Sequence, residues 1–185
     1  MLIETEDTPN PETLKFIPDR NILKTGTADF SSKEFASVSP LASRLFDIDG
    51  VSRVFLATDF ISVTKDIQLD WNNLKPLILT GIMEHFSSGL PTINETEDKQ
   101  SEYINEEDSE TIKQIKDLLE TRVRPAVAMD GGDITFCSFE AGVVTLQMKG
   151  ACAGCPSSTA TLKMGIENML RHYIPEVTEV RAAEL

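Results

Sequence analysis

Two cysteines separated by two residues carry the clearest chemical meaning in this sequence. Cys152 and Cys155 stand at the join between an expected strand and an expected helix, within the run Met148–Thr159. Thiolates are soft ligands that hold zinc and iron–sulfur clusters, and a Cys-x-x-Cys turn directs both sulfurs at one site. The pair is therefore predicted to bind a metal centre or to carry out redox chemistry.

The residues around the pair favour the thiolate form of both cysteines. Pro156 suits the first turn of a helix, so the sulfurs are expected over a helix N-terminus, where amides and the helix dipole lower a thiol pKa. Lys149 would lower the pKa further if its ammonium reaches the site. Gly150 and Gly154 let the backbone approach a bound group and offer N–H donors to it. The alternative interpretation is a structural disulfide or two buried thiols.

The elements that must position the pair form the second half of the chain. A helix is expected from about Asp108 until Arg124-Pro125 stops it, followed by a glycine-containing turn over 127–133. Strands 134–139 and 143–148 come next, then a helix from Pro156 to Pro175 and a third strand near Val180. The apolar stripe of the last helix is Leu162, Ile166, Met169, Leu170 and Tyr173. These elements predict a compact α+β domain over 109–185 with the Cys-x-x-Cys loop at one edge.

Other side chains in this half are interpreted as structural residues and not as ligands. Cys137 lies inside a strand and is expected to act as a small buried hydrophobe rather than as a ligand. Asp130 and Asp133 are expected to bond amides of their own turn, because neither has an obvious basic or metal-binding companion. His172 stands near a helix C-terminus. The predicted site is therefore the two cysteines.

The first half of the chain predicts a second small α+β domain over 1–88. The expected elements are a strand at 14–18, a short helix at 40–46 capped by Ser39, a hairpin of 51–57 with 60–64, and a helix with apolar positions from 74 to 86. Asn72 or Asn73 is the expected cap of that last helix, with Pro76 in its first turn. His85 is interpreted as a helix-end charge or surface residue, with a ligand role as the alternative. The domain is interpreted as a recognition or assembly module.

Residues 89–108 separate the two halves and have almost no apolar periodicity. Acidic residues outnumber the single Lys99, so this segment is expected to be an extended, self-repelling tether. The predicted fold class is thus α+β, with two small α+β domains joined by an acidic flexible linker.

Composition limits the classes of partner. The net charge of −13 argues against nucleic acid and anionic membrane as partners, because both attract clustered Lys and Arg. The acidic start lacks the basic and apolar regions of a signal peptide, and no stretch approaches the ~20 apolar residues of a membrane span. Three cysteines, of which only two are paired by spacing, favour a reducing compartment. A soluble cytoplasmic protein is expected.

The motifs resemble a known family. Residues 118–134 and 142–170 closely resemble the C-terminal domain of the NifU-like (Nfu) iron–sulfur proteins, with Cys152 and Cys155 at the positions of the family's ligands. Residues 8–16 and 55–65 resemble the N-terminal domain of the same proteins. The order of the two domains is similar to that of the mitochondrial and α-proteobacterial members, so the mitochondrial matrix is the alternative to a bacterial cytoplasm.

The resemblance implies a carrier or late scaffold rather than an enzyme. Such a protein would hold a [4Fe–4S] cluster on Cys152 and Cys155, bridge two subunits in a homodimer, receive the cluster from upstream assembly proteins and pass it to apo-proteins. Cys137 is not part of the family pattern.

Two other functions compete with this one. A dithiol oxidoreductase also places Cys-x-x-Cys at a helix N-terminus, but it does so after an early strand of a larger βαβ unit, whereas here the pair follows a hairpin. A closed structural zinc site needs four ligands, and the chain offers no suitably spaced second pair. No phosphate-binding loop or nucleophile–base pair indicates an enzyme.

Overall fold

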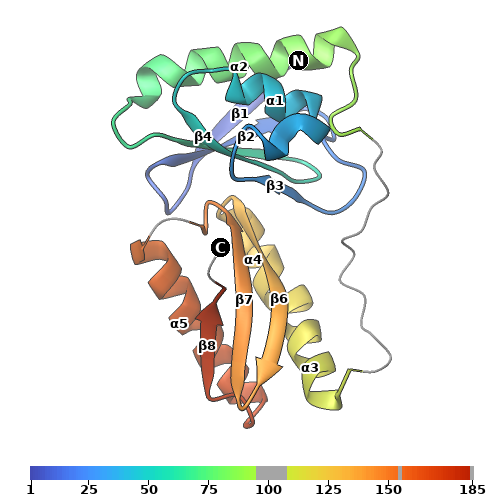
Figure 1. Ribbon diagram of the computed structural model, residues 1–185, viewed down its shortest axis with the longest axis vertical. Coiled ribbons are helices and arrows are strands. Elements are labelled where there is room, and N and C mark those ends of the chain that lie inside the picture. The colour runs from blue at the N-terminus through green and yellow to red at the C-terminus, as the bar shows by residue number, and fades with distance from the viewer. Residues whose placement is uncertain (95–107, 154–155, 184–185) are drawn as a thin grey trace. The chain divides into compact units, whose positions relative to one another are not determined.

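The protein is described by a computed structural model that covers residues 1–94, 108–153 and 156–183. The chain divides into two compact units, Met1–Gln100 and Ser101–Leu185. Each unit combines helices with its own β-sheet (Figure 1), which confirms the predicted fold class of two α+β domains. Residues 95–107, which hold most of the predicted acidic linker, lie outside the described residues.

The first domain is built on an antiparallel sheet with the strand order β1-β2-β5-β4-β3. The predicted strand and hairpin are confirmed, whereas β1 was not predicted because the charged residues Glu4, Glu6 and Asp7 leave no apolar pattern. That strand forms by pairing with β2 along its whole length. The strands are β1 (Ile3–Asp7), β2 (Thr13–Pro18), β3 (Ala28–Phe30), β4 (Val51–Leu56) and β5 (Ile61–Lys65).

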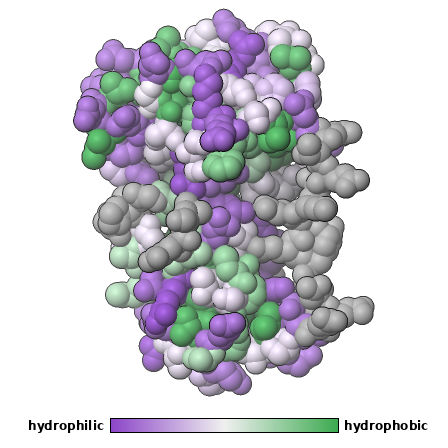
Figure 2. All heavy atoms as spheres, viewed as in Figure 1, coloured by the Kyte–Doolittle hydropathy of each residue, from purple (hydrophilic) through white to green (hydrophobic). Residues whose placement is uncertain are grey.

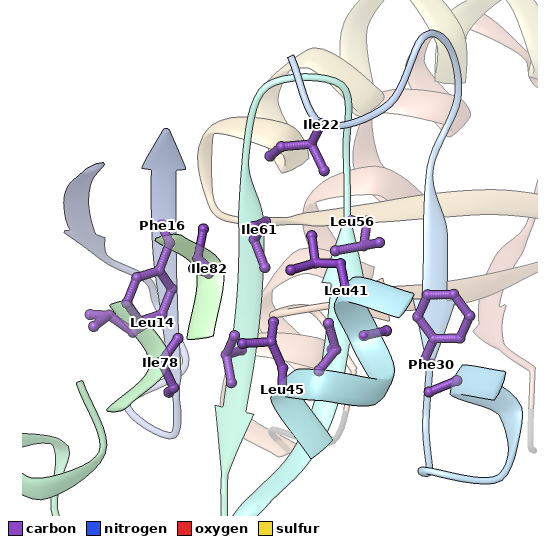
Figure 3. Close-up of a cluster of buried hydrophobic side chains, with 14 of the residues drawn as sticks. Leu14, Phe16, Ile22, Phe30, Leu41, Leu45, Leu56, Ile61, Ile78 and Ile82 are labelled. Atoms are coloured by element: carbon purple, nitrogen blue, oxygen red, sulfur yellow. The ribbon is translucent and has the colours of Figure 1, made fainter. Parts of the chain in front are cut away.

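Two helices and a short 3-10 turn (Phe35–Val38) complete the first domain. Helix α1 (Pro40–Phe46) begins as predicted, since the Ser39 hydroxyl accepts a hydrogen bond from the Ala42 amide at 3.1 Å. The strand-forming and helix-forming segments bring their apolar side chains together between the sheet and the helices, as Figure 3 shows for ten labelled residues. Those residues are Leu14, Phe16, Ile22, Phe30, Leu41, Leu45, Leu56, Ile61, Ile78 and Ile82.

Helix α2 (Trp71–Ser88) starts earlier than predicted. Its cap is Asp70, whose carboxylate accepts from the Asn72 amide at 2.9 Å, so the prediction of Asn72 or Asn73 as the cap was wrong. Because the helix begins at Trp71, Pro76 lies in the helix interior and not in the first turn. An aspartate at this position is the stronger cap because its charge also meets the positive end of the helix dipole.

His85 lies in the last turn of α2, as predicted, but it is buried in the first domain, contrary to its interpretation as a surface residue or helix-end charge. Its side chain is fully inaccessible, and neither ring nitrogen has a hydrogen-bond partner among the residues that the structure describes. It lies one helical turn beyond Gly81, whose face of α2 packs against Arg44, Leu45 and Ile48. Burial lowers the pKa of His85, and the positive charge of Arg44 lowers it further.

Stability of the first domain should therefore depend on His85 at mildly acidic pH. Its pKa is lower in the folded state than in the unfolded chain, so the unfolded state binds the proton first, and stability falls as the pH drops below about 6.5. His85→Leu should remove this part of the pH dependence. Urea unfolding of both proteins between pH 5 and 8 checks this, and parallel curves for the two would contradict it.

The described chain continues past α2 along the surface of the first domain. Gly89 ends the helix in the left-handed region at φ 70°. The Ser39 hydroxyl then donates to the Thr92 carbonyl at 2.6 Å, and the Asn94 amide donates to the Val38 carbonyl at 2.9 Å. Residues 92–94 thus pack beside the start of α1.

The second domain has a three-stranded sheet with the order β6-β7-β8, in which β6 and β7 form an antiparallel hairpin and β8 joins β7 in parallel. The strands are β6 (Gly132–Glu140), β7 (Val143–Gly150) and β8 (Glu179–Ala182). The three predicted strands are confirmed. In Figure 1, α3 (Glu110–Leu118) and α4 (Arg124–Met129) lie along β6, and α5 (Pro156–Tyr173) lies along β8.

The first helical region of this domain does not stop at Arg124-Pro125 as predicted. A π-helical turn, Leu119–Val123, links α3 to α4, and the Arg124 amide donates to the Leu119 carbonyl five residues earlier. A continuous α-helix would require a hydrogen bond from the nitrogen of Pro125, which carries no hydrogen. The wider turn absorbs this loss and lets the helix continue to Met129.

The core of the second domain lies between one face of its sheet and the helices. The alternation predicted for β7 is confirmed, because Val144, Leu146 and Met148 are buried. In α5, Ile166 and Leu170 are buried as predicted, but Tyr173 is exposed and contacts Arg122 through its ring. Ile174 takes the buried place instead, one residue beyond the helix.

On the face that Figure 2 shows, hydrophilic and hydrophobic side chains are interspersed in both domains. No helix among the described residues is both long and apolar enough to cross a membrane.

Candidate metal centre

The cysteine motif lies where the sequence predicts it, between the end of β7 and the start of α5. Strand β7 ends at Gly150, a turn covers 151–153, and α5 begins at Pro156. Cys152 is therefore placed in the turn. Cys155, the second predicted ligand, lies outside the described residues.

Cys152 is buried, which differs from the expected exposed thiolate. Its side chain belongs to the apolar core of the second domain and is 6% exposed. It packs against Gly132, the first residue of β6. A Cβ atom on Gly132 would lie 2.5 Å from the Cys152 Sγ and 2.7 Å from the Lys149 carbonyl oxygen. Only glycine leaves room for the sulfur at this place.

Hydrogen bonds fix the turn that carries Cys152. The Ala151 amide donates to the Gly131 carbonyl at 3.2 Å, and the Ala153 amide donates to the Gly150 carbonyl at 3.1 Å. The Thr159 hydroxyl donates to the Cys152 carbonyl at 2.8 Å. The turn is thus tied both to the start of β6 and to the first turns of α5.

The electrostatic surroundings of Cys152 also differ from the prediction. Burial raises the pKa of the Cys152 thiol to about 12, and the negative charges of Asp130 and Asp133 act in the same direction. The helix N-terminus was expected to lower this pKa, whereas burial of the sulfur raises it, because removing a thiolate from water is costly. Cys152 is therefore a thiol in the metal-free chain, and a bound metal must displace its proton.

Asp133 has a basic companion that the sequence interpretation missed. Two nitrogens of Arg124 donate to its two carboxylate oxygens, at 2.9 Å and 3.0 Å, and the Ile134 amide donates to one of them at 2.8 Å. Arg124 also donates to Glu120 at 2.6 Å. Arg124 and Asp133 are nine residues apart along the chain, and the π-helical turn lies just before Arg124. Local sequence patterns therefore give no sign of this pair.

Cys137 is exposed, so its interpretation as a buried hydrophobe was wrong. It is the extra residue of a β-bulge, since Phe136 lies opposite Leu146 and Ser138 lies opposite Thr145. Ile134, two residues before Phe136, points into the core, and the two-residue period of a strand places Cys137 on the other face. The Sγ atom lies 4.0 Å from the Thr135 carbonyl.

Replacing Cys137 with serine should therefore change little. An exposed hydroxyl needs no protein partner, so the free energy of unfolding should stay within about 0.5 kcal/mol of the wild type. Iron content after reconstitution should also be unchanged. Urea unfolding and an iron assay check both values, and loss of iron from a folded Cys137→Ser protein would make Cys137 a ligand.

The described residues supply one ligand of the predicted pair and little else. No group of three or more His, Cys, Asp or Glu side chains in that part of the chain is arranged to hold a metal ion. Gly132 is the residue beside Cys152 that sequence reasoning passed over. Its signal was the Gly131-Gly132 pair at the start of β6, which was interpreted as a turn without a contact to the cysteine.

Both halves of the chain match families of known proteins. Residues 3–89 match the family described as the scaffold protein Nfu/NifU N-terminal domain, and residues 115–181 match the NifU-like domain. The chain is 53% identical over 181 residues to the human "NFU1 iron-sulfur cluster scaffold homolog, mitochondrial". It is 50% identical over 184 residues to the Arabidopsis thaliana "NifU-like protein 4, mitochondrial".

Each match covers 97% of this chain, and the chain spans 71% of the human relative's length and 65% of the plant relative's. Both domain matches occur in the expected order, and the turn in which Cys152 packs against Gly132 lies inside the NifU-like match. The chain therefore belongs to the NifU-like (Nfu) protein family.

Proposed function

We propose that this protein is an iron–sulfur cluster scaffold and carrier, not an enzyme. In this proposal Cys152 and Cys155 bind a [4Fe–4S] cluster, and the protein passes that cluster to apo-proteins. The observation that carries the proposal is the Cys152 sulfur seated against Gly132 in a turn before α5. The names of the relatives support it, because the human protein is named an iron–sulfur cluster scaffold homolog.

The proposed ligand set requires a second copy of the chain. A [4Fe–4S] cluster is ordinarily held by four cysteine thiolates, and one chain offers two at the predicted spacing. Two Cys-x-x-Cys turns meeting across a two-fold axis would complete the set. The cluster-bound form is therefore proposed to be a homodimer.

The burial of Cys152 argues against the competing function of a dithiol oxidoreductase. Such an enzyme needs an accessible thiolate of low pKa as its nucleophile. Cys152 is buried, and its pKa is raised rather than lowered. Transfer of a cluster to a client's thiolates does not require the metal-free Cys152 to be accessible or to have a low pKa.

The proposal extends to partners and location. Apo iron–sulfur proteins would be the recipients, upstream assembly proteins would be the source of the cluster, and the first domain would hold a client near the cluster-bearing domain. Both relatives described above are named mitochondrial. Their names favour the mitochondrial matrix over the bacterial cytoplasm that was expected first, and none of them supports the latter.

Transfer is the test of this function. Protein reconstituted under anaerobic conditions should activate an apo [4Fe–4S] enzyme faster than free iron and sulfide do, even when a chelator is present. The chelator removes iron that leaves the protein, so continued activation indicates direct transfer. If the chelator abolishes activation, or if the iron-free protein reduces disulfides at the rate of a thioredoxin, the carrier proposal fails.

A further inference from the structure

Arg124 and Asp133 join helix α4 to strand β6 beside the cysteine turn. The guanidinium donates to both carboxylate oxygens, which is the geometry in which arginine holds a carboxylate most firmly. The Asp133 side chain is 5% exposed and that of Arg124 is 27% exposed, so the carboxylate is shielded from water and salt and the guanidinium is partly shielded. This pair is more than a surface ion pair.

The pair acts on the residue against which Cys152 rests. Asp133 directly follows Gly132, whose Cα carries no side chain where the Cys152 sulfur packs. Gly132 lies opposite Gly150 in the hairpin, and Asp133 lies opposite Lys149. Holding Asp133 in place therefore holds Gly132, the end of β7 and the sulfur in one arrangement.

The local backbone indicates that the position of Arg124 is specific. Arg124 directly follows the π-helical turn Leu119–Val123, and such turns occur often at functional sites. A π-helical turn rotates the residues after it relative to an α-helix of the same length. Arg124 can then reach Asp133 while it also binds Glu120 on the preceding turn.

We infer that Arg124 and Asp133 are positioning residues for the cluster ligand Cys152. The pair holds the Gly131-Gly132 turn against the Cys152 sulfur, so that the thiolate is fixed in place when a cluster is bound. The part of the inference that concerns the thiolate in the cluster-bound protein rests on the proposed function. The seating of Cys152 in the metal-free protein does not depend on any cluster.

The test measures the exposure of Cys152 in the metal-free protein. In a Cys155→Ser background, alkylation by iodoacetamide is followed at Cys152 and at Cys137 by mass spectrometry. Arg124→Gln should raise the alkylation rate of Cys152 about tenfold. Cys152 reacts when the turn opens locally, and opening becomes easier when the two charge-assisted hydrogen bonds to Asp133 are lost. The rate at Cys137 should not change. Arg124→Lys should give an intermediate rate, since an ammonium cannot bind both oxygens in the same plane.

Arg181→Gln is the matched control. Arg181 makes the same two-nitrogen contact with Glu179 on β8, at 2.8 Å and 3.1 Å, in an exposed setting. Its loss should leave the Cys152 rate at the wild-type value. Asp133→Asn keeps the shape of the site and tests the pair from the other side, should Arg124→Gln fail to fold. Because it also removes a negative charge that raises the pKa of Cys152, a faster rate in Asp133→Asn with a wild-type rate in the charge-conserving Arg124→Lys counts against the inference.

Reconstituted proteins with both cysteines present give the second measurement. A chelator should remove iron from Arg124→Gln about tenfold faster than from the wild type or Arg181→Gln. If folded Arg124→Lys and Asp133→Asn proteins keep the wild-type Cys152 alkylation rate, the inference is wrong. It is also wrong if Cys137 and Cys152 become reactive by the same factor. If the wild type takes up no cluster, the proposed function fails, and the alkylation result still decides the seating of Cys152.

Discussion

Cys152→Ser is expected to lose the cluster completely. A serine hydroxyl does not ionise readily at neutral pH and is a hard ligand, so it binds cluster iron much more weakly than a thiolate does. The visible absorbance of the reconstituted cluster should disappear, and the iron content should fall to the background of the iron-free protein. An iron assay with an absorption spectrum checks this, and a variant that keeps its full iron content would exclude Cys152 as a ligand.

The same substitution should also destabilise the second domain, because Cys152 is 6% exposed. Burying a hydroxyl without a partner costs about 1–3 kcal/mol. Cys152→Ala is the matched control, since it also removes the ligand but adds no polar group. Both variants should lack iron, and serine should lower the free energy of unfolding more than alanine does. If neither variant is destabilised, Cys152 does not belong to the core.

Gly132→Ala is expected to displace Cys152 without removing it. The new Cβ would lie 2.5 Å from the sulfur and 2.7 Å from the Lys149 carbonyl oxygen, and the second contact is with backbone that cannot swing aside. Overpacking of this kind costs about 1–3 kcal/mol. Most of the cluster should be lost although both cysteines remain. Iron content and urea unfolding measure the two effects.

Gly165→Ala is the control for this substitution. Gly165 lies in α5 of the same domain, and a Cβ there meets no atom within 4 Å. Alanine is a better helix former than glycine, so this variant should be more stable by about 1 kcal/mol and should bind the cluster as the wild type does. Equal iron content in the Gly132→Ala and Gly165→Ala proteins would show that Gly132 does not seat the sulfur.

Much of the fold was predictable because local patterns determine it. The alternation along β7, the helical stripe of α5 and the cap of α1 each follow from residues within a few positions of one another. The failures involve contacts between distant residues. Strand β1 forms only because β2 offers it a partner, and the burial of His85 depends on how α2 packs on α1.

The place of Cys152 in the loop after β7 was predictable, and its environment was not. The role of Cys152 and Cys155 as ligands stays a prediction. The spacing of Cys152 and Cys155 locates the site at one loop, whereas the burial of Cys152 depends on Gly132, twenty residues earlier. The raised pKa of Cys152 follows from that burial and from two nearby carboxylates. The contact between Arg124 and Asp133 depends on the π-helical turn, which forms where Pro125 interrupts the ordinary pattern.

Native mass spectrometry of the anaerobically reconstituted protein tests the central proposal most directly, because it reports the number of chains and the cluster in one measurement. The proposal predicts one species made of two chains and a single [4Fe–4S] cluster, and its loss in Cys152→Ser. A single chain that carries a complete cluster without any added thiol would contradict it.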